Sequence, residues 1–242
     1  MKSWRIGAIT VAAVGSLTKA AAAQENPTPI AIQGSAPRPL TAPKEAFEID
    51  VNTGYTQGFG AISGQRGGAV SDVARGGIDV GLGLGYRATP ELAIGVTGQY
   101  QELAPAAAQS TGTRVRGAAL GVEGKVHFRP YERVDPWLSV GTGYRMLWIA
   151  PQGPGNNLLQ HGFDLARGQV GLDVRVSPDI ALGPVIGGDL NLFTSRNPEG
   201  PEGNSMIPDK RVSTFLFAGV QGRFDLGGSR VENTGTIQVG SR

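Results

Sequence analysis

Charged side chains occur at alternate positions within several apolar segments of this 242-residue chain. Successive side chains of a β-strand point to opposite faces, so residues two apart lie on the same face. Carboxylates and basic groups that share a face can form ion pairs, or can line a polar path if that face surrounds a space. The residues with this spacing are Glu48, Asp50, Asp79, Glu123, Lys125, Arg145, Arg167, Asp173, Arg175, Asp189 and Arg223.

The two histidines are the candidates for acid–base catalysis. His127 continues the alternation of Glu123 and Lys125, whereas His161 lies in a polar connection with Asp164 nearby. Neither has a serine nucleophile in a suitable position, so we predict no catalytic residues and no enzyme activity. Two distant histidines make no metal site, and we expect no cofactor. Three acidic residues of the last long connection lack the spacing of a calcium loop: Glu199, Glu202 and Asp209.

Eight strands must hold these side chains. The alternation is clearest in Ile78–Tyr86, where aliphatic residues and tyrosine share one face while aspartate and glycines share the other. The predicted strands span residues 46–57, 75–87, 91–102, 113–128, 137–149, 163–176, 180–193 and 212–224. A tilted strand needs roughly 9–11 residues to cross a bilayer, so these segments are long enough to do so.

The connections between the predicted strands differ in length. The second, fourth and sixth are short (88–90, 129–136 and 177–179), whereas the first, third, fifth and seventh are longer and polar (58–74, 103–112, 150–162 and 194–211). In an up-and-down meander, odd and even connections lie at opposite ends. Short turns at one end and long loops at the other are typical of a transmembrane β-barrel.

Aromatic residues indicate which face meets the lipid. Those on the apolar face fall near the strand ends: Phe47, Tyr86, Phe128 and Phe224 at the short turns, and Tyr55, Tyr100 and Trp148 toward the long loops. Two aromatic girdles around an apolar band suit the two interfaces of a bilayer. A secreted soluble β-protein, with its apolar face inward, is the alternative.

The charged face then lies inside the barrel. Register across the short connections pairs Arg167 with Asp189, Asp79 with Gln99, His127 with Trp137, and Lys125 with Ser139. The interior of an eight-stranded barrel is narrow enough to be filled by side chains, and buried charges there must be paired. We therefore predict a lumen filled by a polar, ion-paired network. A narrow conduit or small-ligand cavity remains open as an alternative.

The two ends of the chain have their own character. Residues 1–23 are typical of a signal peptide cleaved after Ala23, 24–45 form a Pro-rich periplasmic spacer, 46–226 the barrel and 227–242 a tail. Cleavage would remove Lys2, Arg5 and Lys19 from the 22 basic residues and none of the 20 acidic ones, leaving a formal charge of −1. We therefore expect no nucleic-acid partner. With no cysteine, the exported chain has no disulfides.

Signal, strand number, connection lengths, girdles and charged lumen together make this chain similar to the small outer-membrane β-barrels of Gram-negative bacteria, of the OmpA transmembrane-domain or OmpX type. A segment such as Gly83–Arg87, followed by a short Pro-containing turn, fits that resemblance. It implies outer-membrane lipids as partners, insertion by the barrel-assembly machinery, and structural, envelope or surface-interaction roles. Members commonly end on an aromatic residue. Here Phe224 takes that place, but a tail follows, in which residues 236–239 form a possible pairing segment.

Basic residues gather in or beside the long connections: Arg66, Arg75, Arg114, Arg116, Arg196, Lys210 and Arg211. Guanidinium groups recognise phosphate bidentately, and lipopolysaccharide presents phosphates at that height. Arg114 and Arg116 share the parity of the outward apolar residues, so they are the predicted lipopolysaccharide contacts. Ordinary solvated loop charges are the alternative.

The sequence thus predicts an all-β, eight-stranded antiparallel up-and-down transmembrane β-barrel that is not an enzyme. The alternatives, in order, are a narrow channel or transporter for small solutes or hydrophobic molecules, a barrel enzyme that modifies lipid A or phospholipids, and a soluble periplasmic β-barrel. The loop ligand and the oligomeric state are not predicted.

Overall fold

The computed structural model describes residues 40–107, 109, 111–152, 157–199 and 203–230. The predicted signal peptide, most of the Pro-rich spacer and the tail beyond residue 230 lie outside them. Among the described residues, no helix has the length and apolar character needed to span a membrane.

The described chain consists mostly of strands in the segments where apolar and polar residues alternate. Eight strands are long, and they are accompanied by one two-residue strand and one four-residue helix. The bounds are β1 Ala46–Gly60, α1 Val70–Val73, β2 Ala74–Arg87, β3 Leu92–Pro105, β4 Arg114–His127, β5 Val134–Ala150, β6 Leu158–Ser177, β7 Ile180–Pro198, β8 Ser205–Met206 and β9 Val212–Leu226.

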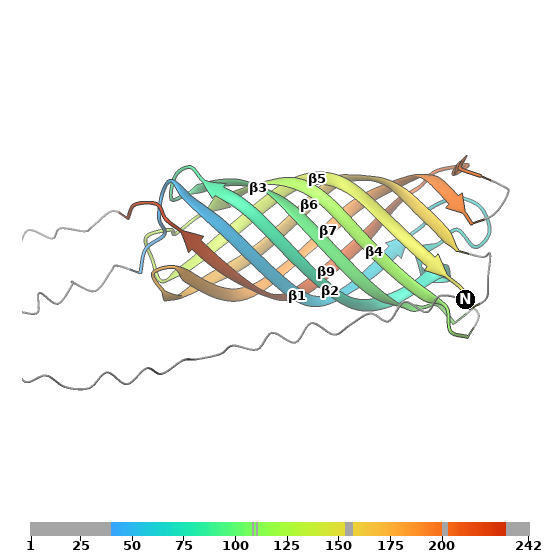
Figure 1. Ribbon diagram of the computed structural model, residues 1–242, viewed down its shortest axis with the longest axis horizontal. Coiled ribbons are helices and arrows are strands. Elements are labelled where there is room, and N and C mark those ends of the chain that lie inside the picture. Colours follow the sequence, from blue (N-terminus) through green and yellow to red (C-terminus); the bar gives the residue numbers. More distant parts are fainter. Residues whose placement is uncertain (1–39, 108, 110, 153–156, 200–202, 231–242) are drawn as a thin grey trace, which may run out of the picture. The chain divides into compact units, whose positions relative to one another are not determined.

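The long strands form one closed antiparallel barrel (Figure 1). Strands β1 to β7 each pair with the next long strand, β7 pairs with β9, and β9 returns to pair with β1. The short β8 pairs with β7 alone, at Ser195 and Arg196. The predicted eight-stranded up-and-down barrel is confirmed. Closure leaves no long strand with an unpaired edge.

Two strands, β6 and β7, extend farthest beyond their predicted bounds. β6 begins at Leu158 and β7 ends at Pro198, and the two are paired there through main-chain hydrogen bonds, which polar side chains do not prevent. The prediction that His161 lies in a loop is therefore wrong, because it lies in β6. The connections 106–113 and 151–157 are also scarcely longer than 128–133, so the contrast in length is clear only for the first and last of the four long connections.

The apolar face of the barrel points outward. Leu120 is 65% exposed, Val220 is 60% exposed and Val122 is 56% exposed, although they lie in the middle of strands. Exposed aromatic rings lie near both ends: Phe47, Tyr86, Phe128 and Phe224 near the short turns, and Tyr55 and Tyr100 toward the long loops. An apolar band of this kind, flanked by rings, fits a hydrocarbon environment.

A short helix closes the lumen at the end of the long connections, which we call the loop end; the opposite end is the turn end. In α1, Val70 and Val73 are buried against inward residues of the barrel, including Leu147 and Phe215. Gly58 makes room for this packing, because a Cβ there would lie 2.4 Å from Val70 Cγ1. We call the buried cluster of α1 and its neighbours the apolar cap: Ile62, Val70, Val73, Ala74, Leu103, Val115, Leu147, Ile149, Phe193, Ile207 and Phe215.

Candidate functional site

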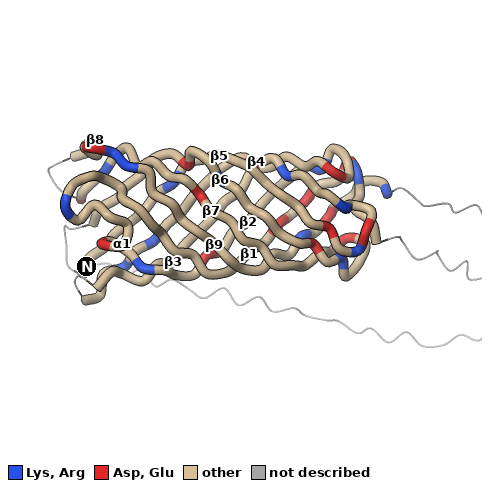
Figure 2. Tube along the Cα trace, turned by 180° about the vertical axis from the view of Figure 1, so that it is seen from behind, with Lys and Arg blue, Asp and Glu red and all other residues tan. Residues whose placement is uncertain are grey.

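The inward charges of the barrel form two groups. In Figure 2 the charged positions are denser at the end away from α1 and β8. The turn-end cluster comprises Glu48, Asp50, Arg87, Lys125, His127, Asp135, Trp137, Asp173, Arg175, Gln221, Arg223 and Asp225, all buried. The loop-end cluster, nearer the apolar cap, comprises Thr56, Asp79, Gln99, Gln101, Arg145, Asp164, Arg167 and Asp189.

Arg223 lies at the centre of the turn-end cluster. Its Nε donates to Asp50 Oδ1 at 2.8 Å, and its Nη1 donates to Asp173. Asp50 also accepts from Lys125 Nζ at 2.5 Å and from Gln221 Nε2 at 3.0 Å. The guanidinium of Arg223 and the ammonium of Lys125 lie 5.5 and 5.1 Å from the ring centroid of Trp137, within range of cation–π attraction. One cation thus joins strands β1, β6 and β9 across the lumen.

Two further arginines bind the lumen wall to the short turns. Arg87 donates through Nε to Glu48 at 2.5 Å and through Nη1 to the carbonyl of Pro90 at 2.7 Å. Arg175 donates through Nη1 to Asp225 at 2.7 Å and to the carbonyl of Pro178 at 3.1 Å. Each guanidinium therefore joins another strand to the turn that follows its own strand: Arg87 reaches the adjacent β1, and Arg175 reaches β9 on the far side of β7.

Several members of this cluster are not among the site residues predicted from the sequence. Arg87, Asp135 and Asp225 lie at strand ends, where the predicted boundaries gave them to turns or left their facing undecided. Their positions could have identified them, because they have the same odd or even numbering as the inward residues of their strands. Arg87 shares this parity with Asp79 in β2, and Asp225 shares it with Arg223 in β9.

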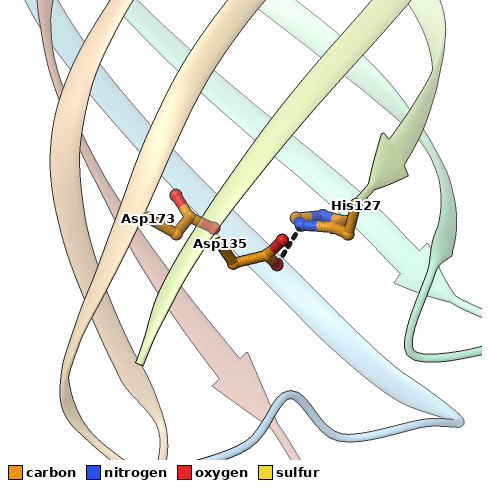
Figure 3. A group of neighbouring side chains, drawn as sticks. All are labelled: His127, Asp135 and Asp173. Carbon is orange, nitrogen blue, oxygen red and sulfur yellow. Dashed lines mark hydrogen bonds and ion pairs between the residues drawn. The ribbon is translucent and has the colours of Figure 1, made fainter. Parts of the chain in front are cut away.

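His127, Asp135 and Asp173 form the one buried group within the described residues whose ligand atoms lie close enough together to hold a metal ion (Figure 3). The donors around it argue against an ion. His127 Nε2 faces Arg87 Nη2 at 3.1 Å and Arg223 Nη1 at 3.2 Å, and since arginine only donates, Nε2 accepts. The proton of a neutral ring is then on Nδ1, which donates to Asp135 Oδ2 at 2.7 Å.

The remaining carboxylate of that group is also occupied. Asp173 accepts from Trp137 Nε1 at 3.1 Å through Oδ1, and from Arg223 through Oδ2. Ser139 pairs with Lys125 in the register, and Trp137 lies opposite His127, as predicted. The serine is therefore not placed beside the histidine, so the group fits a hydrogen-bonded relay between strands better than a metal or nucleophilic site.

In the loop-end cluster, the predicted contact between Arg167 and Asp189 is present, with Arg167 Nε donating to Oδ1 at 2.9 Å. Arg145 binds the other oxygen of Asp189, and its Nη1 donates to Gln101 Oε1 at 2.9 Å. Arg167 Nη2 donates to Asp164 Oδ2 at 2.9 Å. The two arginines therefore share one carboxylate.

One sequence prediction for this cluster is wrong, and one buried carboxylate was not predicted. Asp79 pairs with Gln101, not Gln99, and accepts from Gln101 Nε2 at 2.9 Å, because β2 and β3 are joined by a longer turn than predicted. Asp164, named above only as a neighbour of His161, is buried in the lumen. An irregularity in the ladder between Asp164 and Ala166 lets both Asp164 and Arg167 face inward.

The other predicted site residues lie at the margins of these clusters or outside the lumen. Glu123 makes one ion pair, 3.6 Å from Lys125 Nζ. Arg116 lies on the outer wall and donates to Glu102 at 3.0 Å, with both side chains partly exposed. Arg114 is exposed at the start of β4.

Comparison with known proteins gives structural matches only. No family model and no curated protein matches the chain. Neisserial surface protein A matches with a TM-score of 0.50 and 13% identity over 74% of this chain and 96% of its own. The outer membrane protein OprG from Pseudomonas aeruginosa matches with a TM-score of 0.50 and 10% identity over 77% of this chain and 99% of its own. This chain therefore has the fold of the small outer-membrane β-barrel proteins.

Proposed function

We propose that this chain is an integral outer-membrane protein with a structural or surface-interaction role, and that its lumen does not conduct. The observation that carries the proposal is the filling of the lumen at successive levels. Arg223 joins β9 to β1 and β6 near the short turns, Arg145 and Arg167 converge on Asp189 farther along, and α1 covers the loop end with buried apolar side chains.

The outer surface supports the membrane location. Mid-strand residues such as Val122 and Val220 are exposed, which in water would leave a large unpartnered apolar surface. A closed barrel satisfies its main-chain hydrogen bonds internally, as a hydrocarbon environment requires. The fold shared with known outer-membrane proteins supports the same location. The long connections then face outward, and insertion requires the barrel-assembly machinery.

The same filling argues against a narrow channel, the first alternative from the sequence. An ion or solute would have to displace buried ion pairs at two levels and then pass the apolar cap. For a lipid-modifying enzyme, His127 is unsuited because Asp135 and two arginines hold its ring. His161 does have a serine beside it, contrary to the sequence prediction, since Ser195 is its register partner in β7. Its ring contacts Tyr144, however, and the Ser195 hydroxyl contacts Met206, so the two are engaged with other partners in the outer wall.

Planar-bilayer recording tests the proposal. We expect the purified, refolded chain to leave the conductance of the bilayer at its baseline. Steady, discrete openings at low salt would contradict the closed lumen. Outer-membrane fractions run on a detergent gel with and without boiling test the location separately, because a folded barrel changes mobility on heating. Recovery of the chain among the soluble periplasmic proteins would refute the membrane assignment.

A further inference from the structure

The outer wall carries a groove of about 700 Å³ near the loop end. Residues from β3 to β7 line it, with more from the connection that precedes β6 and the one that follows β7. The side chains used below are Tyr100, Arg114, Arg116, Trp148, Leu159 and Glu199, and we call the space the wall groove. Its volume lies within the range of small-molecule sites, roughly 300–1,000 Å³.

Strand register explains how these side chains come together. Arg116 pairs with Trp148, and Trp148 pairs with Leu159 on the next strand. Paired residues of neighbouring strands point to the same face, so these three form a row around the outer wall. The row places a cation, an indole ring and an aliphatic side chain side by side.

The groove is apolar toward the middle of the barrel and charged toward the loops. Tyr100 pairs with Ala118, which lies two residues beyond Arg116 in the direction of the turn end. Arg114 lies two residues from Arg116 in the other direction and pairs with Ala150. The alanines leave space beside the larger side chains. The groove therefore changes from apolar to cationic along the barrel axis, as a membrane lipid changes from chain to headgroup.

One cation of the groove is available for a ligand. Glu102 accepts from Arg116 Nε at 3.0 Å and from the hydroxyl of Tyr100 at 2.9 Å, which positions both donors. Glu199 accepts from Asn157 at 2.5 Å. Within the described residues, Arg114 has neither a hydrogen-bond partner nor an ion-pair partner for its guanidinium. A guanidinium at the edge of a lipid-facing groove is suited to bidentate binding of phosphate.

We propose that the wall groove binds lipopolysaccharide, with a lipid phosphate on Arg114 and Arg116 and an acyl chain against Tyr100, Trp148 and Leu159. The proposal rests on the proposed function, because only an outer-membrane barrel with its long connections outward places this groove in the leaflet that contains this lipid. It goes further by assigning the ligand to one shaped site.

A matched pair of double variants tests the site. Arg114→Ala with Arg116→Ala removes both groove cations. Arg66→Ala with Arg75→Ala removes the same charge from exposed positions toward the same end of the barrel, outside the groove. We expect lipopolysaccharide, titrated against purified barrels in detergent, to raise the unfolding temperature of the wild type and the control at similar concentrations. The groove variant should require a lipopolysaccharide concentration at least about tenfold higher for the same rise in unfolding temperature, because charge-assisted contacts are lost.

Two further arms identify the ligand and the apolar contact. Lipopolysaccharide stripped of its lipid phosphates should bind the wild type no more tightly than it binds the groove variant. Phosphatidylglycerol should bind the wild type more weakly than intact lipopolysaccharide does. Trp148→Ala should weaken binding without changing the mobility shift on heating. Equal responses of the groove and control variants would overturn the site, and equal binding of phosphatidylglycerol would overturn the choice of lipid. Neither result would alter the conductance or the membrane fraction, on which the proposed function depends.

Discussion

The two ends of the barrel are closed by different chemistry. At the turn end, buried cations and carboxylates interlock, and arginines also bind the carbonyls of the turns. At the loop end, a smaller ion-paired cluster lies beneath an apolar cap built from α1 and inward residues of the barrel. The difference teaches that a polar lumen can be sealed either by paired charges or by a short apolar insertion.

The two closures should respond differently to substitution. A buried charge that loses its partner is strongly destabilising, whereas trimming an apolar side chain leaves a cavity whose cost depends on how the site relaxes. Partner redundancy adds a second difference. Among the described residues, Asp173 has one ion-pair partner, Arg223, whereas Asp189 has two, Arg145 and Arg167.

The largest effect is expected for Arg223→Met. The substitution leaves Asp173 without its cation and removes one of the two cations at Asp50. We expect the free energy of unfolding, measured by urea titration in lipid vesicles, to fall by about 3–5 kcal/mol. Arg66→Met, at an exposed loop position, is the control and should change little. A loss below that of Arg145→Met would reverse the ranking of the two ends.

Arg145→Met should cost less, about 2 kcal/mol, because Asp189 keeps Arg167 and Gln101 keeps its bonds to Thr56 and Asp79. The same urea titration measures it. The double variant with Arg167→Met removes both cations from Asp189, and we expect its loss to exceed the sum of the single losses. Additive losses would show that the two arginines act independently.

Val70→Ala tests the apolar cap and should cost about 1–2 kcal/mol, since it removes part of a fully buried side chain. The effect should be local. We expect faster hydrogen exchange in residues 61–74 and unchanged exchange at the turn end. Val51→Ala, on the exposed lipid-facing side of β1, is the matched control. Uniform loss of protection around the barrel would contradict a cap that opens by itself.

Arg116→Ala should change stability least, by no more than about 0.5 kcal/mol, because its pair with Glu102 is exposed. The urea midpoint without added lipid measures this. The result sharpens the contrast between ion pairs of the lumen and those of the outer wall. A loss comparable to that of Arg145→Met would mean that this surface pair is structural.

Much of the fold can be predicted from the sequence, because the alternation of apolar and polar residues indicates both the strands and the face on which each side chain lies. Alternation alone placed Arg167 and Asp189 on the inward face, and the predicted three-residue connection 177–179 gave their register, which the structure has. Asp164 was missed because a ladder irregularity changes which parity faces inward, and such an irregularity leaves no mark in the alternation. Gln101 was missed as the partner of Asp79 because register depends on turn length: the ladder ends on Arg87 and Ala93, so five residues separate the last paired positions instead of the predicted three.

The cap and the wall groove were harder to predict. A helix as short as Val70–Val73 shows no periodicity, and its two valines are separated by polar residues in a segment that otherwise reads as a loop. For the groove, parity placed Arg114 and Arg116 on the outer wall. Their position beside Trp148 and Leu159 depends on the registers of two further strand pairs, which the long connections do not determine.

The pairing of β1 with β9 has a consequence for how the barrel assembles. Asp50 and Arg223, separated by most of the barrel sequence, are direct partners in that ladder as well as an ion pair. The turn-end cluster therefore cannot be completed until the last strand joins the first. Contacts between such distant segments are slow to form, so we expect closure to be a late, all-or-none step of folding. The ion pair between Asp50 and Arg223 therefore forms only when β1 and β9 meet in their native register and the barrel closes.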